Sequence, residues 1–458
     1  METICALSTA PGQGAIAVIR LSGSRSVEIG DSVFFTSSGK RLATCLPNRA
    51  VYGEIRSGGE VLDEALVTVF RSPHSFTGED TVEFSCHGSP YIVQEFLQLL
   101  IRQGARSALP GEFTQRAFLH GKIDLSRAEG IADLIASGTA AQHRLAMHQM
   151  RGGFSQELGV LRRALVELTS LVELELDFSE EDVTFADRQR LRALSLEIET
   201  RLRRLTESFA VGNAIKNGVP VAIVGTPNAG KSTLLNLLLG EDRAIVSPHP
   251  GTTRDTVEDT LVLSGIPFRL IDTAGIREHT ADEVEAVGIS RTFLAIEQAA
   301  VILWVVDLTA PIEETVALSG RLLSGSCSLI ILLNKRDLVP HSVVEATSAA
   351  LGATAPFPLL PFSAVASGSL APLHAALVEA AVPGHSADVV ISNVRHYEAL
   401  VLSRAALCRV VVGLADGLPA DMVTQDLRES LHYLGLITGE ITTDEILQTI
   451  FSRFCVGK

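Results

Sequence analysis

A short apolar stretch that leads into a glycine-rich loop constrains this chain more than any other feature. Residues 219–224 are apolar and partly β-branched, which predicts a buried strand. Gly225-Thr-Pro-Asn-Ala-Gly-Lys-Ser232 follows, and then the helical spacing of 233–239. This order of strand, loop and helix is the P-loop, whose backbone N–H groups surround nucleotide phosphates. In this motif Lys231 reaches the outer phosphates and the Ser232 hydroxyl coordinates Mg²⁺.

Two later motifs identify the base that accompanies these phosphates. The apolar stretch 329–333 is followed by Asn334-Lys-Arg-Asp337. Its aspartate can accept hydrogen bonds from N1–H and the 2-amino group of guanine, which adenine does not offer. Ser363-Ala364 would close over the base. The sequence therefore predicts a site for GTP.

Two polar segments between these motifs are predicted to respond to the γ-phosphate. In Gly251-Thr-Thr-Arg-Asp255, Thr253 would complete the magnesium shell. In Asp272-Thr-Ala-Gly275, the aspartate would bind magnesium through water and the glycine would sense the γ-phosphate. The next residue is Ile276, which cannot orient the attacking water as a glutamine does in many GTPases. Either hydrolysis is very slow, or another group is supplied.

The rest of the chain predicts two other kinds of structure around this α/β unit. The first 119 residues mix strand patterns with one helical segment at 90–101. Apolar residues three and four apart predict long helices over 125–150, 154–210 and 393–454. We therefore expect a multidomain α/β protein with an N-terminal α+β domain, a discontinuous helical domain and an inserted Ras-like P-loop GTPase domain. The expected ranges are 1–119, 120–217, 218–381 and 382–458.

Composition limits the partners and the compartment. The formal net charge is −15, and residues 218–381 hold nine Lys/Arg against 17 Asp/Glu, so any contact with RNA must be a local patch or depend on a partner. The apolar runs are far shorter than the roughly 20 residues of a membrane helix. The N-terminus lacks the basic start of a signal peptide, so we expect a cytoplasmic protein. The six cysteines are scattered, which argues against a zinc or disulfide framework.

With these motifs in place, the whole chain resembles the MnmE (TrmE) family, the tRNA-modification GTPases of bacteria and organelles. Blocks outside the nucleotide motifs carry most of the resemblance, together with the C-terminal tail. They are Pro11-Gly-Gln-Gly14, Arg20-Leu-Ser-Gly23, Ser75-Phe-Thr-Gly-Glu-Asp80, Pro110-Gly-Glu-Phe-Thr-Gln-Arg-Ala-Phe-Leu119, Lys122-Ile-Asp-Leu125, Ala128-Glu129 and Phe454-Cys-Val-Gly-Lys458.

The resemblance implies a reaction and partners. Such a protein forms a homodimer and a heterotetramer with the FAD protein MnmG. Together they install an aminomethyl or carboxymethylaminomethyl group at carbon 5 of the wobble uridine of certain tRNAs. The carbon comes from a tetrahydrofolate derivative, in the 5,10-methylene or 5-formyl form, which the N-terminal domain binds. Four residues match the folate-binding positions: Arg20, Glu79, Lys122 and Lys458. Cations suit the glutamate carboxylates of a folate, and a carboxylate can accept from its pterin N–H groups.

The resemblance also supplies the group that Ile276 cannot. It implies a potassium ion beside the phosphates, held by Asn228, Ser247, His249 and Thr252, with Glu285 positioning the water. A monovalent cation there would neutralise charge that develops in the transition state. Cys455 matches a functional position in the tail, with its role left open. The full predicted GTP site is Asn228, Ala229, Gly230, Lys231, Ser232, Thr233, Ser247, Pro248, His249, Pro250, Gly251, Thr252, Thr253, Asp272, Thr273, Ala274, Gly275, Asn334, Lys335, Asp337, Ser363 and Ala364.

Two other functions compete with this interpretation. A GTPase switch that binds RNA during ribosome assembly would usually carry a basic module, whereas the flanking segments here are helical and acidic. A folate-dependent one-carbon transferase alone would leave the nucleotide motifs unexplained. The sequence leaves open which tRNAs are used, which amine is the co-substrate and which surface contacts tRNA.

Overall fold

The computed structural model describes residues 1–177, 188–241, 259–271, 296, 298–311, 327–352, 357–365, 370–382, 390–452 and 454–457. They divide into two compact units. The first unit comprises Met1–Ala132, Gln149–Val160 and His432–Lys458, and the second comprises Asp133–His148 and Leu161–Leu431. The four domain ranges expected from the sequence stay a prediction.

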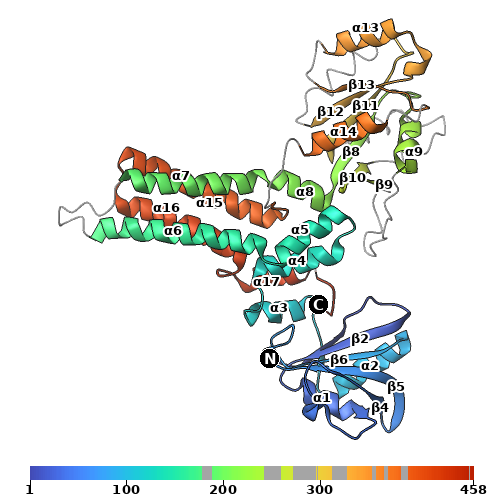
Figure 1. Cartoon of the computed structure of the whole chain (residues 1–458), viewed down its shortest axis with the longest axis vertical. Coiled ribbons are helices and arrows are strands. Elements are labelled where there is room, and N and C mark those ends of the chain that lie inside the picture. Colours follow the sequence, from blue (N-terminus) through green and yellow to red (C-terminus); the bar gives the residue numbers. More distant parts are fainter. Residues whose placement is uncertain are drawn as a thin grey trace. The chain divides into compact units, whose positions relative to one another are not determined.

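The first unit is built on a seven-stranded sheet in the order β3-β4-β5-β6-β2-β1-β7. Strands β2, β4, β5 and β6 of this sheet are labelled in Figure 1. Neighbouring strands are antiparallel, except that β1 and β7 are parallel. The strands are β1 Ile4–Leu7, β2 Gly14–Ser22, β3 Phe34–Thr36, β4 Ala50–Ser57, β5 Glu60–Phe70, β6 Thr81–Gly88 and β7 Arg106–Ser107. The strand patterns predicted for the first 119 residues are confirmed; β2 begins at Gly14, and β1 lies antiparallel beside it.

One face of this sheet is buried under helices α1 (Ser26–Val33) and α2 (Pro90–Arg102). Alternate residues of the strands point into this core, which is the period-two pattern expected for a half-covered sheet. Phe84 of β6 packs edge-to-face on Phe96 of α2, with ring centroids 5.0 Å apart, and both rings are fully buried. The other face leaves apolar side chains exposed, among them Phe35, Tyr52 and Leu66, and Tyr52 lies directly opposite Leu66 in the β4–β5 register.

A small helical core completes the first unit. It contains α3 (Glu112–Leu119), the beginning of α4 (Leu125–Ala136) and α17 (Asp444–Phe451). Leu125 and Ala128 pack there with Phe451 and Phe454. The C-terminal helical stretch, predicted to reach residue 454, ends at Phe451, and a short tail follows.

The second unit contains a six-stranded sheet in the order β13-β12-β11-β8-β10-β9, in which only the β9–β10 pair is antiparallel. The strands are β8 Val219–Val224, β9 Asp259–Leu263, β10 Ile266–Ile271, β11 Val301–Asp307, β12 Ser328–Asn334 and β13 Leu359–Pro361. Residues of β8 alternate between two cores. Val221 and Ile223 pack with α9 (Lys231–Glu241) and α14 (Leu370–Ala381), while Ala222 and Val224 pack with α13 (His341–Gly352). Helices therefore cover both faces, and the predicted Ras-like P-loop fold is confirmed.

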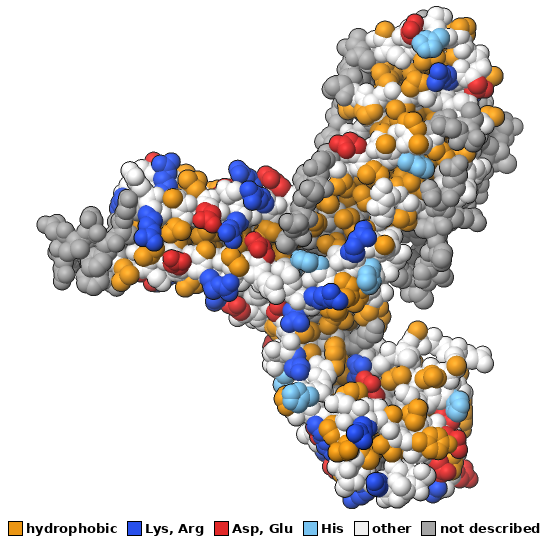
Figure 2. Space-filling model, in the orientation of Figure 1, with side chains coloured by type: hydrophobic (Ala, Val, Ile, Leu, Met, Phe, Trp, Pro, Cys, Tyr) orange, Lys and Arg blue, Asp and Glu red, His pale blue; other side chains and the backbone are white. Residues whose placement is uncertain are grey.

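Long helices form the remainder of the second unit (Figure 1). They are α5 Ala140–Met150, α6 Gly153–Asp177, α7 Arg188–Glu207, α8 Phe209–Asn217, α15 Val394–Asp416 and α16 Ala420–Thr438, of which α5, α6 and α16 extend partly into the first unit's ranges. The α6 stripe of Leu161, Leu165, Leu168 and Val172 is buried, as its spacing predicts. On the face drawn in Figure 2, Lys and Arg side chains are interspersed with Asp and Glu along these helices.

The predicted helical stretch 125–150 is divided into α4 and α5. The break lies at Ser137-Gly138-Thr139, and a reciprocal cap explains it. Gln142 Oε1 accepts from the N–H groups of Gly138 (2.8 Å) and Thr139 (3.1 Å), and Thr139 Oγ1 accepts from Gln142 N (3.2 Å). A Thr-x-x-Gln capping box satisfies the first donors of a new helix, so α5 begins afresh at Ala140.

Candidate functional site

The P-loop joins the end of β8 to the start of α9. A Cβ on Gly225 would overlap the Val305 carbonyl oxygen, and a Cβ on Gly230, at φ +100°, would overlap the Asn334 amide nitrogen. Only glycine fits at these two places. Asn228 lies between them with a left-handed φ of 61° and an exposed side chain. The loop geometry is therefore fixed by neighbours on two other strands.

Asn334 connects the P-loop to the segment that would close over the base. Its side chain is 2% exposed; Nδ2 donates to Ala229 O (2.7 Å) and Oδ1 accepts from Ala364 N (3.1 Å). Asp337 is exposed, and its Oδ1 accepts from Ser363 Oγ at 2.7 Å. Lys335 is held separately, by Asp307 at 2.6 Å. The structure thus brings three predicted segments, 225–233, 334–337 and 363–364, into one site.

Lys231 and Ser232 stand at the N-terminus of α9, where helix N–H groups and the helix dipole favour an anion. Lys231 Nζ donates to the carbonyls of Gly225 (2.9 Å) and Thr226 (2.8 Å). Burial lowers the pKa of this lysine from its ordinary value, because the charged form loses solvation. Ala229 is fully buried and Thr233 is exposed on α9.

Thirteen of the predicted site residues lie outside the described residues. They are Ser247, Pro248, His249, Pro250, Gly251, Thr252, Thr253, Asp272, Thr273, Ala274, Gly275, Glu285 and Lys458. The roles predicted for them in magnesium, potassium, GTP and folate binding therefore stay predictions.

The loop 71–80 of the first unit gathers the three described residues that match folate-binding positions. The Arg20 guanidinium lies over the ring of Phe76, 5.3 Å from its centroid, and pairs with Glu83 at 2.8 Å. Lys122 Nζ donates to Pro73 O at 2.8 Å. Glu79 belongs to the loop itself. Residues more than 100 positions apart in sequence thus meet around one loop.

Two residues beneath this loop were not predicted as site residues, although the block Pro110–Leu119 contains both. Arg116 is buried and donates to Glu79 Oε2 at 2.9 Å and to Glu112 Oε1 at 2.9 Å. Glu112 also binds Arg106, at 2.6 Å. Their spacing of four residues on α3 was the available sequence signal, since it places both side chains on one helical face.

The tail that carries Cys455 is held against the first unit at two points. Ser8 Oγ donates to Gly457 O at 3.1 Å, next to the end of β1. Gly111 N donates to Cys455 O at 3.4 Å. The Cys455 side chain itself is exposed. The thiol is therefore accessible while its backbone is fixed.

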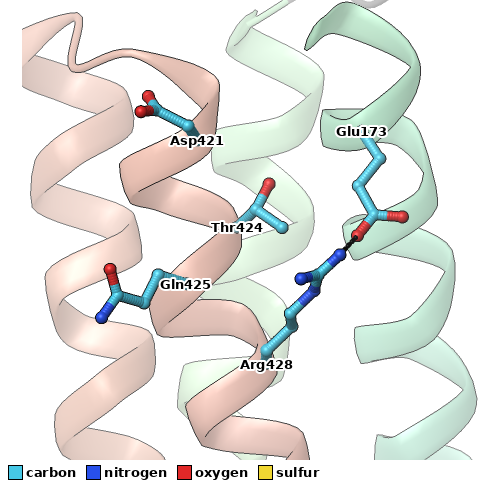
Figure 3. Close-up of a pocket in the computed structure, with 5 residues that line it drawn as sticks. All are labelled: Glu173, Asp421, Thr424, Gln425 and Arg428. Carbon is cyan, nitrogen blue, oxygen red and sulfur yellow. Dashed lines mark hydrogen bonds and ion pairs between the residues drawn. The ribbon is translucent and has the colours of Figure 1, made fainter. Parts of the chain in front are cut away.

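Two hollows in the second unit contain none of the predicted site residues. One, of about 370 Å³, is lined by Glu173, Asp421, Thr424, Gln425 and Arg428 of α6 and α16 (Figure 3). Its ion pair, Arg428–Glu173 at 2.8 Å, is exposed, and such pairs contribute little. The other, of about 230 Å³, lies beside the Lys216–Asp133 pair. The described residues contain no group of three or more His, Cys, Asp or Glu side chains that could hold a metal ion. None of the helices described is both long and apolar enough to cross a membrane.

Glu112 gives a testable pH dependence. Burial alone would raise its pKa, but hydrogen bonds from Arg106, Leu109 N and Arg116 outweigh burial and lower it from 4.5 to about 2. A lowered carboxyl pKa adds stability that is fully present above the unfolded value and is lost as the pH falls toward 2. The shift corresponds to about 3 kcal/mol of unfolding free energy.

We therefore expect Glu112→Gln to lower the free energy of urea unfolding at pH 7, and the difference from the unmodified protein to shrink steadily between pH 5 and pH 2. Glu60→Gln, at an exposed position of β5, is the matched control and should change little at any pH. A Glu112→Gln difference that is the same at pH 7 and pH 3 contradicts the pairing.

The fold and the nucleotide site define a P-loop protein of the Ras-like guanine-nucleotide-binding class. The chain belongs to the MnmE family. The family model described as "MnmE helical domain" matches residues 125–455, and that described as "GTP-binding protein TrmE N-terminus" matches residues 3–122.

Curated relatives match over their whole length. The protein named tRNA modification GTPase MnmE from Parabacteroides distasonis is 51% identical over 472 residues, covering 100% of both chains. The protein of the same name from Bacteroides thetaiotaomicron is 51% identical over 467 residues, covering 100% of this chain and 99% of its own. The one from Flavobacterium johnsoniae is 48% identical over 465 residues, with the same coverage.

Proposed function

We propose that this chain is a cytoplasmic GTP hydrolase that acts in tRNA modification, with residues 218–381 as its GTPase domain between the helical ranges 120–217 and 382–458. The observation that carries the proposal is Asn334, whose buried side chain joins the P-loop to the base-closing segment. A site assembled in this way binds phosphates and guanine together. The full-length relatives named as tRNA modification GTPases support the second half of the proposal.

Two measurements test this function. GTP should displace a labelled guanine nucleotide from the purified chain where ATP does not; equal competition contradicts the guanine site. Mass spectrometry of wobble nucleosides from a strain that lacks the protein should show loss of the C5 substituent. Unchanged nucleosides with altered ribosome profiles would instead favour the ribosome-assembly GTPase.

Hydrolysis in this proposal uses a potassium ion in addition to Mg²⁺. Ser232 and Thr253 would coordinate the magnesium, and Asn228, Ser247, His249 and Thr252 the potassium. Ile276 follows the Asp272–Gly275 motif, so no glutamine orients water there, and Glu285 takes that role. The exposed side chain of Asn228 at the outer side of the P-loop supports a cation ligand at this position.

The potassium proposal predicts a cation-dependent rate. With K⁺, kcat for GTP should exceed that with Na⁺ by about a hundredfold or more, which is the effect of removing one hydrogen-bond donor to a transition-state charge. Asn228→Ala should reduce the K⁺ rate to the Na⁺ rate. Asn217→Ala, at the exposed end of α8, is the matched control and should keep the stimulation. Equal rates in both salts contradict the metal site.

The first unit would bind the tetrahydrofolate derivative, 5,10-methylene in the reaction and 5-formyl as a stable analogue. Arg20 and Lys122 would meet its carboxylates and Glu79 its pterin N–H groups, with Lys458 at the end of the tail. Their common position around loop 71–80 supports one ligand. Cys455 would take part in catalysis from the fixed tail.

The proposed assembly is a homodimer that joins MnmG in a heterotetramer acting on the wobble uridine of tRNA. The exposed apolar face of the first sheet supports self-association. Phe35, Tyr52 and Leu66 lie on its neighbouring strands β3, β4 and β5, each about half exposed. The interspersed charges of the helical surface favour a local RNA contact or one made through MnmG.

A further inference from the structure

Arg116 is the most completely buried cation of the first unit's site, and it touches Glu79 directly. Its side chain is 3% exposed and sits at the centre of a chain of alternating charges. Going outward, Arg116 pairs with Glu112 at 2.9 Å, and Glu112 pairs with Arg106 at 2.6 Å. On its other side Arg116 pairs with Glu79 at 2.9 Å. The Glu79 carboxylate is therefore at one end of a row of ion pairs that continues through Arg116 and Glu112 to Arg106.

The contacts of Glu79 are confined to one of its two carboxylate oxygens. Oε2 accepts from Arg116 Nη1 at 2.9 Å and from Ser22 Oγ at 3.0 Å. Ser22 in turn is fixed by Thr77, with 2.8 Å between the two hydroxyls, and both residues are fully buried. Oε1 has no hydrogen-bond partner among the described residues. The arrangement locks the carboxylate and leaves one oxygen for a ligand.

Arg116 is itself prevented from turning away. Its Nη2 donates to the Glu2 carbonyl at 2.8 Å as well as to Glu112, and its Nε is buried without a partner among the described residues. Glu112 is anchored by Leu109 N at 2.9 Å and by Arg106. A guanidinium held by three acceptors has one orientation, because its donors form a rigid fork.

We propose that Arg116 is a positioning residue for the folate site, and this rests on the proposed binding of the folate by Glu79. Arg116 balances the charge of Glu79 and fixes its plane, so that Oε1 faces the N–H edge of the ligand's pterin ring. An ionised carboxylate that is largely buried is costly unless it is paired. The pairing with Arg116 therefore holds Glu79, which accepts from the ligand, in place before the ligand binds. Binding then loses less conformational entropy.

A purely structural role for the ion-pair chain is the competing explanation, and Arg106 separates the two. Arg106 binds the same Glu112 but makes no contact with Glu79. If Arg116 acted only by holding α3 in place through Glu112, then removing Arg106 would have a similar effect on the ligand. If it acts on Glu79, removal of Arg106 should leave binding almost unchanged.

The test is calorimetric titration of the full chain with 5-formyltetrahydrofolate. Arg116→Gln should weaken binding by about tenfold to a hundredfold, the range for a lost hydrogen bond to a charged group. Arg116→Lys should recover part of the loss. Arg106→Gln should stay within about twofold of the unmodified chain, because Arg106 makes no hydrogen bond to Glu79. Glu79→Gln should weaken binding to a similar extent. Adding Arg116→Gln to Glu79→Gln should weaken binding little further, because both changes remove the same Arg116–Glu79 interaction.

Unaltered binding by Arg116→Gln overturns the proposal, and so does an equal loss in Arg106→Gln. Additive losses in the Glu79→Gln, Arg116→Gln double variant overturn it as well. If Arg116→Gln lowers the melting temperature of the first unit, the same titration of Arg116→Lys, which keeps the charge, decides between the two explanations. Full affinity for the ligand in Arg116→Lys, which has no guanidinium, overturns the proposed positioning role. An unmodified chain that does not bind 5-formyltetrahydrofolate contradicts the proposed folate function itself, which is a distinct result.

Discussion

Replacing Asp337 with asparagine is expected to weaken GTP binding by about a hundredfold or more and to create affinity for xanthosine triphosphate. The carboxylate can accept both N–H donors of guanine, whereas an amide presents one N–H group against another. Ser363 Oγ holds Asp337 Oδ1 at 2.7 Å, so the side chain cannot turn to relieve the mismatch. Xanthine replaces the 2-amino group by a carbonyl and accepts from the amide. Fluorescence titration with labelled nucleotides measures both affinities.

Arg336→Gln is the matched control, since Arg336 is the exposed neighbour of Asp337. It should change GTP affinity by less than about threefold, as is usual for an exposed charge. An Asp337→Asn protein that still prefers GTP over xanthosine triphosphate would show that another residue recognises the base.

A second large effect is expected from Gly457→Ala. Gly457 has a φ of +96°, and a Cβ there would overlap the Leu7 carbonyl oxygen. Alanine is strained in this conformation and has no space, so the tail should leave its place beside β1. Cys455 would then lose its fixed position. We expect tRNA modification, measured by wobble-nucleoside mass spectrometry in complemented cells, to fall by about tenfold or more.

GTP hydrolysis by the purified Gly457→Ala protein should stay unchanged, because the nucleotide site is built entirely from the second unit. Val456→Ala is the matched control: Val456 is 55% exposed, so shortening it leaves the tail docked. Full modification by Gly457→Ala would mean that the tail works without its contact to β1.

The nucleotide site was largely predictable because its chemistry is local. The P-loop, Asn334–Asp337 and Ser363–Ala364 each follow a short apolar strand, and parallel strands end at the same edge of a sheet. Sequence order alone therefore brings the three segments together. The bond between Asn334 and Ala229 was not foreseen, since spacing along the chain says nothing of which buried side chain spans two loops.

The site of the first unit shows the opposite case. Glu79 and Arg116 are 37 positions apart and belong to a loop and a helix, so no periodicity relates them. On helical spacing alone, a charged residue such as Arg116 is expected at the surface, and only the tertiary fold makes it the buried partner of a carboxylate. The division of the stretch 125–150 was visible in principle, because Thr139 and Gln142 form a capping box. Apolar spacing on both sides of the break concealed it.

The bond between Ser8 and Gly457 has a consequence for biosynthesis. It joins positions 449 residues apart, so β1 leaves the ribosome long before the segment that docks on it. At roughly 5–20 residues per second, the wait is about 20 to 90 seconds. The N-terminal sheet can pair its strands during that time, but the tail that carries Cys455 cannot dock on it until translation has passed the last helix. A chain that terminates early would thus hold a folded sheet and a nucleotide site without this tail, and the proposed role of Cys455 in tRNA modification would be lost.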